Sequence, residues 1–244
     1  ADEAAAAGVP PALYPELTVR VGPGAAAQLV REVEADVVLN AIVGFAGLES
    51  TLAALENGRG LALANKESLV CAGSLVTGLA RQRGLEILPV DSEHSALYQL
   101  IAAAGREAVE SVVITASGGP FRGWGASALR TVTREQALAH PTWSMGEKIT
   151  VDSATLVNKG LEVIEAHHLF DLPYERIEVV VHPQSVVHAL VRLVDGALLA
   201  HLGTADMRVP IAYALHYPER GRVAVERLDL ASGLSLRFEA PDAE

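Results

Sequence analysis

Two acidic side chains lie close together in the segment Pro89-Val-Asp-Ser-Glu-His94, directly after an apolar run. Successive side chains of an extended chain alternate between its two faces, so Asp91 and Glu93 are expected to point the same way. Like charges this close repel each other, and a cation bound between them would remove the conflict. On these residues alone, two exposed acids at the end of a strand are the more common arrangement. The pair is therefore a candidate cation site that needs a third ligand.

A helix predicted over residues 153–170 offers that ligand. Asn158 and Glu162 are four residues apart and share a face of this helix, apart from its apolar stripe. Aligned polar residues usually mark only a solvated surface, but Gly160 interrupts the same helix at a cost of about 1 kcal/mol relative to alanine. Close approach of a ligand or of another backbone would explain this glycine. Three carboxylates without cysteine favour a hard cation, Mg²⁺ or Mn²⁺, over Zn²⁺.

Hydrogen-bond donors suited to a phosphate occur in the same part of the sequence. Serine, asparagine, lysine and histidine are the usual donors to such a group, and Ser153 is expected at a helix start, where backbone N–H groups are free. Each donor taken alone is more simply explained as a helix cap or a turn residue. The candidates are Lys66, Ser92, Ser117, His140, Ser153, Asn158 and Lys159.

The first third of the chain, which carries the earliest of these residues, alternates between strands and helices. Such alternation predicts right-handed crossovers and a parallel sheet. Strands are expected at residues 17–21, 36–43, 60–64 and 85–90, with helices over 24–34, from 48 to a stop at Gly58, and over Lys66–Arg83 with Gly84 as its end.

The pattern changes near residue 91, and the second half is predicted to be α+β. Asp195-Gly196 between two apolar runs is a strong signal for an antiparallel hairpin. Thr133-Arg-Glu-Gln136 matches a capping box at the start of a short helix. The other expected elements are a helix over 95–104, a strand over 111–116, a sharp turn at Ser117-Gly-Gly-Pro120, an irregular loop over 140–148, and strands over 186–194 and 197–202.

Length and charge narrow the classes of function. The 244 residues suit one large or two small domains, and a net charge of −11 argues against a nucleic-acid or anionic-membrane partner. The single cysteine, Cys71, excludes an internal disulfide, fits a reducing compartment such as the cytoplasm, and is expected to be buried. The chain starts without Met and shows neither a signal-peptide pattern nor a long apolar run, so we expect a processed or truncated chain with no membrane-spanning helix.

Several longer motifs, taken together and in order, resemble 1-deoxy-D-xylulose 5-phosphate reductoisomerases, from about Val19 to the end of the chain. These motifs are Ala64-Asn-Lys-Glu-Ser-Leu-Val70, Pro89-Val-Asp-Ser-Glu-His94, Thr115-Ala-Ser-Gly-Gly-Pro-Phe-Arg122, His140-Pro-Thr-Trp-Ser-Met-Gly146, Val151-Asp-Ser-Ala-Thr-Leu-Val-Asn-Lys-Gly-Leu-Glu162, His182-Pro-Gln-Ser185 and Gly203-Thr-Ala-Asp-Met-Arg208.

The resemblance implies a reaction and its cofactors. The family converts 1-deoxy-D-xylulose 5-phosphate to 2-C-methyl-D-erythritol 4-phosphate in non-mevalonate isoprenoid biosynthesis, using NADPH and a divalent cation, Mg²⁺ or Mn²⁺, with Co²⁺ a further option. By resemblance, Asp91, Glu93 and Glu162 are the metal ligands, and residues 140–148 form a flap that closes over the substrate. Phosphate, hydroxyl or other substrate contacts are implied for Lys66, Ser92, Ser117, His140, Trp143 (the lid of the flap), Ser153, Asn158 and Lys159, and cofactor contacts for Asn65, Glu67 and Gly146.

The same resemblance implies a fold and an assembly. We expect the C-terminal part of a Rossmann-like NADPH domain over residues 1–90, an α+β catalytic domain over 91–235 that forms a homodimer through its hairpin, and the start of a linker over 236–244. The Gly-rich NADPH loop and the C-terminal helical domain of the family are not found in these residues. We therefore expect a truncated chain that binds metal and a phosphorylated ligand better than NADPH. Its alanine and arginine content suggests a bacterial source.

Two other readings stay open at this point. The same three acids could serve a metal-dependent sugar-phosphate isomerase or aldolase that uses no nicotinamide. The chain could also be an inactive fragment that binds a phosphorylated ligand, with a small-molecule partner and neither nucleic acid nor membrane.

Overall fold

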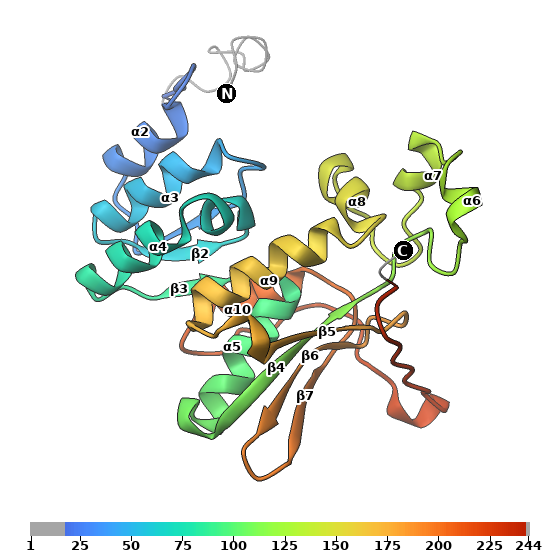
Figure 1. Ribbon diagram of the computed structural model, residues 1–244. Helices are drawn as coiled ribbons and strands as arrows, with labels where there is room; N and C mark the ends of the chain where they lie inside the picture. The colour runs from blue at the N-terminus through green and yellow to red at the C-terminus, as the bar shows by residue number, and fades with distance from the viewer. Residues whose placement is uncertain (1–17, 243–244) are drawn as a thin grey trace. The chain divides into compact units, whose positions relative to one another are not determined.

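The computed structural model describes residues 18–242, which divide into two compact units, the first ending at Leu88 and the second beginning at Pro89 (Figure 1). The first unit contains a three-stranded sheet in the order β1-β2-β3, in which β1 (Val37–Asn40) and β2 (Gly60–Leu63) pair in parallel. The expected parallel sheet is thus confirmed. Its remaining elements are β3 (Ile87–Pro89) and the helices α2 (Ala25–Glu32), α3 (Gly47–Glu56) and α4 (Lys66–Arg83).

Helix α4 begins and ends where the sequence predicts. The Asn65 side chain caps it by accepting a hydrogen bond from the Ser68 N–H, and the same side-chain amide donates to Ile42 O and Gly44 O. Gly84 ends the helix with a φ of 65°, a conformation that glycine adopts without steric cost. A kink at Ala72, where the backbone leaves helical geometry, was not predicted.

Two expectations for this unit are wrong. Residues 18–21 form no strand, and residue 17 lies outside the described part of the chain. Cys71 is exposed rather than buried, because it lies on the solvent side of α4.

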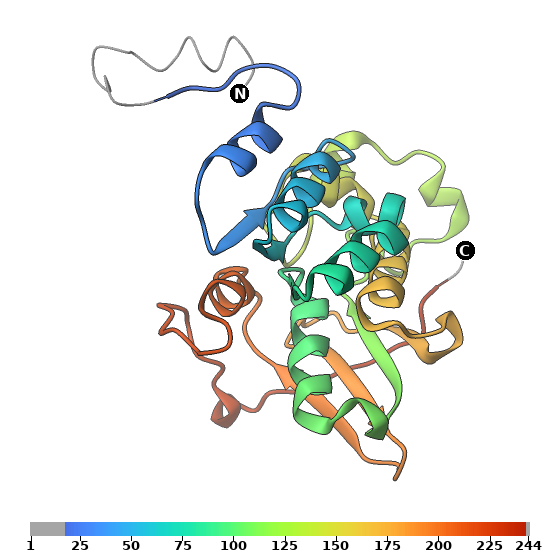
Figure 2. The ribbon, with the colours of Figure 1, turned by 90° about the vertical axis from the view of Figure 1, so that its left-hand side faces the viewer.

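The second unit is built on a four-stranded mixed sheet in the order β5-β4-β6-β7. Strand β4 pairs in parallel with β5, and the other neighbours are antiparallel. Strands β6 and β7 form the predicted hairpin, which Figure 2 shows in orange. The strands are β4 (Val109–Ala116), β5 (Ile177–Val181), β6 (Val187–Leu193) and β7 (Leu198–Leu202).

The core of this unit lies between the sheet and two helices, α5 (Ser92–Ala104) and α9 (Val157–Phe170). Strand β4 is central, and its run of β-branched residues is buried on both faces. Val112 and Ile114 pack beneath the helices, whereas Val113 belongs to a smaller cluster with Val187 and Leu190.

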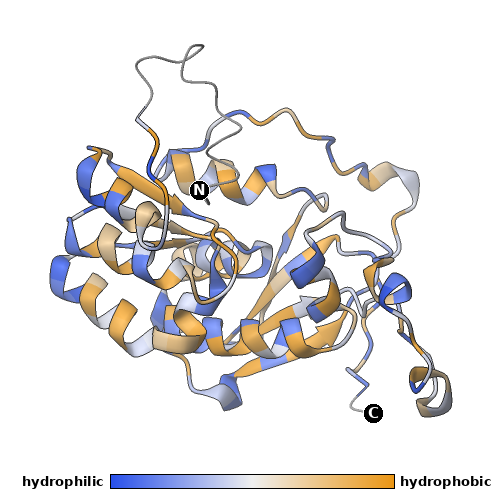
Figure 3. Cartoon of the chain, turned by 90° about the horizontal axis from the view of Figure 1, so that it is seen from above, coloured by the Kyte–Doolittle hydropathy of each residue, from blue (hydrophilic) through white to orange (hydrophobic). Residues whose placement is uncertain are grey.

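The remaining elements are short. The capping box at Thr133 is present as predicted, with hydrogen bonds in both directions between Thr133 and Gln136. In Figure 3 the strands are largely hydrophobic and the helices carry alternating hydrophobic and hydrophilic bands. Among the described residues, every helix is too short or too polar to cross a membrane. The short helices of the second unit are α6 (Ala126–Leu129), α7 (Arg134–Leu138), α8 (Glu147–Ser153) and α10 (Arg208–His216), and its 3₁₀ helices are η1 (Arg106–Ala108), η2 (Tyr174–Arg176) and η3 (Leu230–Ser232).

The helix expected over residues 153–170 is instead two helices, α8 and α9, separated by residues 154–156. The expected loop over 140–148 is correspondingly shorter, because α8 already begins at Glu147. The chain bends at this junction where Gly119 packs against it. An added Cβ at Gly119 would lie 2.4 Å from the Ser153 carbonyl oxygen, so only a residue without a Cβ can pack this closely against the bend.

Candidate functional site

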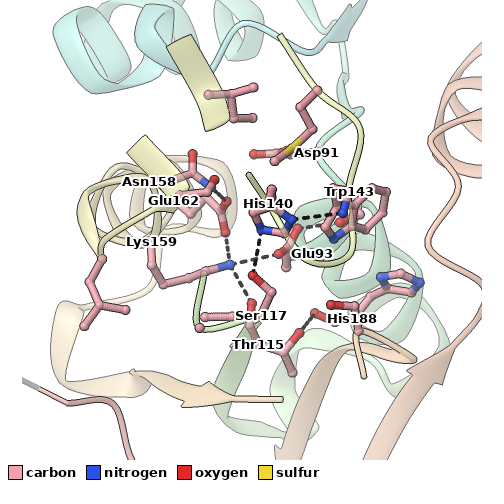
Figure 4. A pocket seen from close by; sticks show the side chains of 18 of the residues that line it. Asp91, Glu93, Thr115, Ser117, His140, Trp143, Asn158, Lys159, Glu162 and His188 are labelled. Carbon is pink, nitrogen blue, oxygen red and sulfur yellow. Dashed lines mark hydrogen bonds and ion pairs between the residues drawn. The ribbon is translucent and has the colours of Figure 1, made fainter. Parts of the chain in front are cut away.

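A pocket of about 300 Å³ opens in the second unit beside the C-terminal end of β4 and the N-terminal ends of α5 and α9 (Figure 4). It gathers most of the residues that the sequence singles out. Of the predicted site residues, the lining includes Asp91, Ser92, Glu93, Ser117, His140, Trp143, Ser153, Asn158, Lys159 and Glu162.

The three predicted carboxylates converge. One oxygen each of Asp91, Glu93 and Glu162 lies within 4.8 Å of the others. Opposite ligands of an octahedral Mg²⁺ are about 4.2 Å apart, twice its usual metal–oxygen distance, so the spacing suits one hard cation. Asp91 and Glu93 were expected to point the same way because they share one face of an extended strand, and this reason is wrong. Asp91 is the residue before α5, and Glu93 lies in the first turn of that helix.

Polar side chains surround these carboxylates. Lys159 Nζ donates to Glu93 Oε1 at 2.8 Å, to the Thr115 carbonyl at 2.5 Å, and to Glu162 Oε2. Ser92 Oγ donates to Glu93 Oε2, and Asn158 Nδ2 donates to Glu162 Oε1, each at 2.5 Å.

Burial and charge oppose each other at this cluster. Burial alone would raise the pKa of the Glu93 carboxyl, but the charge of the Lys159 ammonium and the hydrogen bonds from Lys159 and Ser92 together outweigh burial and lower that pKa. Burial likewise works to lower the pKa of Lys159, and the Glu162 and Glu93 carboxylates reverse this and raise it. The Lys159 ammonium and the Glu93 carboxylate therefore favour each other's charged forms.

Behind the carboxylates lies a buried histidine that the sequence argument did not use. His94 Nε2 lies 2.9 Å from the backbone carbonyl of Glu162, and its Nδ1 lies 3.5 Å from Glu165 Oε2. His94, Glu165 and Asp91 form a second group of side chains with metal-ligating atoms close together. The signal for His94 was present, since it ends the motif that carries the two acids.

Ser117 and His140 form the other side of the pocket. His140 Nδ1 accepts hydrogen bonds from the backbone N–H groups of Thr142 and Trp143, at 3.2 and 2.9 Å. The proton of the neutral ring therefore lies on Nε2, which donates to Ser117 Oγ at 3.0 Å. Ser117 Oγ also accepts from the Gly119 N–H at 3.3 Å. Burial lowers the pKa of His140, which favours the neutral ring that this arrangement requires.

Two expectations about the helix start are wrong. Ser153 is the last residue of α8, so it lies at a helix end and not among free backbone N–H groups. Gly160 meets open space, since an added Cβ would have no atom of the described residues within 4 Å, and close approach of another backbone does not explain it. The close approach occurs at Gly119, which brings the Ser117 loop against Ser153.

The remaining predicted residues are placed elsewhere. Gly146 directly precedes α8 and is not among the pocket-lining residues. Asn65, Lys66 and Glu67 belong to the first unit, where Asn65 and Lys66 are buried and the Asn65 amide serves the fold through its bonds to residues 42–44.

The lining residues that sequence reasoning did not single out include Thr115, Ser185, His188 and Met207. Thr115 fixes the floor of the pocket, because its carbonyl accepts from Lys159 and its hydroxyl bonds to the carbonyls of Val187 and His188. Ser185 has a positive φ of 50°, which is uncommon for a non-glycine residue. All but His188 lie in motifs quoted from the sequence, so a signal existed.

Fold and site together define a two-unit α/β protein whose second unit carries an acidic pocket suited to a hard divalent cation and lined with hydrogen-bond donors. Family models described as 1-deoxy-D-xylulose 5-phosphate reductoisomerase match residues 2–73, and two of its C-terminal domain models match residues 87–170 and 202–244. The chain belongs to the 1-deoxy-D-xylulose 5-phosphate reductoisomerase family.

Individual relatives agree with the family models. The chain is 58% identical over 209 residues to the reductoisomerase of Chlorobium chlorochromatii, covering 86% of this chain and 55% of that one. It is 55% identical over 229 residues to that of Acidithiobacillus ferrooxidans, covering 94% and 58%. The chain thus spans little more than half the length of these relatives.

Solved structures are similar as well. A crystal structure of a DOX-P reductoisomerase in complex with NADPH, fosmidomycin and magnesium superposes with a TM-score of 0.86 at 49% identity, covering 91% of this chain and 57% of that one. The Zymomonas mobilis reductoisomerase in complex with NADPH gives 0.83 at 47% identity, covering 91% and 57%.

Proposed function

We propose that this chain carries the metal- and substrate-binding part of an enzyme that converts 1-deoxy-D-xylulose 5-phosphate to 2-C-methyl-D-erythritol 4-phosphate. The observation that carries the proposal is a pocket in which three carboxylates adjoin serine, asparagine and lysine donors. A sugar phosphate needs both kinds of group, because its hydroxyl and carbonyl oxygens suit a cation and its phosphate suits hydrogen-bond donors.

Each residue has a role in this proposal. Asp91, Glu93 and Glu162 hold Mg²⁺ or Mn²⁺, which when bound supplies a Lewis acid for neighbouring substrate oxygens. The phosphate-binding side chains are Ser117, Ser153, Asn158 and Lys159, with Ser92 and His140 beside them. Residues 140–148, carrying Trp143, cover the substrate and exclude water.

The nicotinamide is part of the same proposal. The similar solved structures include complexes with NADPH, which favours NADPH-dependent reduction over an isomerase or aldolase that uses no nicotinamide. Asn65, Lys66, Glu67 and Gly146 remain the residues proposed to contact cofactor or substrate. When bound, NADPH supplies the hydride for the reduction.

Assembly and location complete the proposal. Strand β7 lies at one edge of the sheet and exposes Leu198 and Leu202 on one side, with Val194 exposed in the turn before it. An apolar outer strand of this kind supports a homodimer formed through the hairpin. A bacterial cytoplasmic location, which suits a chain with one cysteine, is proposed with it.

The test is Mn²⁺ binding, followed by the electron paramagnetic resonance signal of free Mn²⁺. Wild-type chain is expected to bind one Mn²⁺ per pocket, and Glu162→Gln to bind it at least about tenfold more weakly, because a lost charged ligand costs more than about 1.4 kcal/mol. Glu175→Gln is the matched control, since Glu175 is an exposed acid in η2 and outside the pocket lining. Equal affinities for wild type and Glu162→Gln would refute the proposed metal site.

A further inference from the structure

The ammonium group of Lys159 lies inside the carboxylate cluster rather than beside it (Figure 4). The residue is 6% exposed, and its Nζ reaches Glu93, Glu162 and the Thr115 carbonyl. An ammonium group has three hydrogens to donate, and these three acceptors use all of them. In this arrangement Lys159 has no hydrogen left for a phosphate.

The acceptors that hold Lys159 are also the atoms a cation would need. Lys159 takes Glu93 Oε1 and Glu162 Oε2, while Ser92 and Asn158 take the other oxygens of the same two carboxylates. A divalent cation on these oxygens would repel the ammonium at contact distance, and in a buried site that repulsion is weakly screened. The cation and the ammonium therefore compete for one position.

Two side chains that donate to the carboxylates, those of Lys159 and Asn158, are also the ones that the proposed function assigns to the substrate. Lys159 and Asn158 are proposed phosphate or hydroxyl donors, and both donate to metal ligands in the structure. Whatever removes them from the carboxylates makes their hydrogens available to a ligand. Cation binding would do this.

We propose that Lys159 is the resident cation of the carboxylate cluster, that a divalent cation displaces its ammonium group, and that Lys159 can then bind the phosphate or a hydroxyl of the substrate. The inference rests on the proposed function. It has two consequences: cation and phosphate bind with positive coupling, which is reciprocal, and removal of the Lys159 charge strengthens cation binding because it removes a competitor.

The experiment compares wild-type chain with Lys159→Met and Arg106→Met. Arg106 is an exposed cation that follows the far end of α5, so its substitution removes the same charge without touching the pocket. Mn²⁺ affinity is measured by paramagnetic resonance, and inorganic phosphate affinity is measured by calorimetry with and without saturating Mn²⁺. Samples of Mn²⁺ and phosphate without protein correct for their direct association.

We expect Lys159→Met to bind Mn²⁺ about tenfold or more tightly than wild type, and Arg106→Met to match wild type. Mn²⁺ should raise the phosphate affinity of wild type by about fivefold to 150-fold, the usual range of coupling between sites, and should leave that of Lys159→Met nearly unchanged. If Lys159→Met binds Mn²⁺ no more tightly than wild type, or if Mn²⁺ leaves wild-type phosphate affinity unchanged, the displacement is refuted. Absence of Mn²⁺ binding by wild type would instead refute the proposed function.

A second measurement follows the lysine ammonium groups of the wild-type chain directly. The lysines of the chain are Lys66, Lys148 and Lys159, so nitrogen-15 spectra of wild-type chain contain few ammonium signals. Hydrogens held by three acceptors exchange slowly with water, and we expect one ammonium signal to persist without metal and to broaden or shift when Mg²⁺ is added. Because Lys66 is buried as well, the Lys159 signal is identified by its loss in Lys159→Met, and a Lys159 signal unchanged by saturating Mg²⁺ would show that the ammonium is not displaced.

Discussion

Gly119 offers the sharpest test of how the pocket is assembled. It lies in the turn after β4 with a φ of +65°, and an added Cβ would lie 2.4 Å from the Ser153 carbonyl oxygen and 3.2 Å from the Ala154 Cα. Both neighbours are backbone atoms at the α8–α9 junction, so neither can swing aside as a flexible side chain could. Gly119→Ala should therefore push the Ser117 loop away from Ser153.

Two terms set the size of the effect. A left-handed backbone costs a residue with a Cβ about 1–2 kcal/mol, and the displacement needed to relieve overpacking costs about 1–3 kcal/mol. Gly119→Ala should lower the free energy of unfolding by about 2–5 kcal/mol, the sum of both terms. Gly123→Ala is the control, because its φ is +80° but its Cβ would have nothing within 4 Å, so it bears only the first term.

Urea denaturation followed by tryptophan fluorescence measures the difference. Trp124 and Trp143 are the two tryptophans of the chain, and both lie in the second unit, so the signal reports that unit alone. Gly119→Ala should be less stable than Gly123→Ala by about 1–3 kcal/mol, and its phosphate affinity should fall as well. Equal unfolding free energies for the two variants would refute the close approach of the loop to the α8–α9 junction.

Two further predictions concern the flap and the assembly. Burial lowers the pKa of His140 from its ordinary value of 6.5. On acidification the unfolded chain therefore takes up a proton at this ring before the folded chain does. The contribution of the neutral ring to the free energy of unfolding is present above about pH 6.5 and is lost as the pH falls through the folded-state pKa. An NMR titration of the His140 ring, assigned with His140→Gln, should give a midpoint below 6.5, and a midpoint at or above this value would contradict the geometry. For the hairpin, light scattering should give wild-type chain twice its mass of 25.6 kDa, and Leu198→Lys should shift it toward the monomer because it places a charge on the exposed side of β7. Leu230→Lys, at an exposed leucine in η3, is the control, and identical masses for wild type and Leu198→Lys would exclude this interface.

The sequence predicts the bounds of a helix correctly where capping residues next to the helix determine where it begins and ends. Helix α4 was predicted with its observed bounds because Asn65 and Gly84 act within a few residues of the helix they delimit. The hairpin at Asp195-Gly196 and the capping box at Thr133 are determined in the same way.

Contacts distant in sequence account for the errors. Residues 153–170 have a continuous helical pattern, yet the chain bends after Ser153 where Gly119 from another element packs against it. The convergence of the three carboxylates was anticipated, but for the first two it depends on the start of α5 rather than on an extended strand. The occupation of that cluster by Lys159 had no local signal, because side-chain reach and burial decide it.

The hydrogen bond between His140 and Ser117 also determines which ligands the pocket can accept. The ring proton on Nε2 and the Gly119 N–H both point at Ser117 Oγ, so the hydroxyl turns its own hydrogen outward. An incoming atom at this position must bring a lone pair, because a ligand N–H or P–OH hydrogen would meet an oxygen whose acceptor sites are already filled. A fully ionised phosphate meets this requirement with every oxygen, whereas its protonated form or a sulfonamide does so with fewer. A phosphate bound at Ser117 would thus be favoured in its ionised form, and the hydrogen bond from His140, which also lines the pocket, sets that preference.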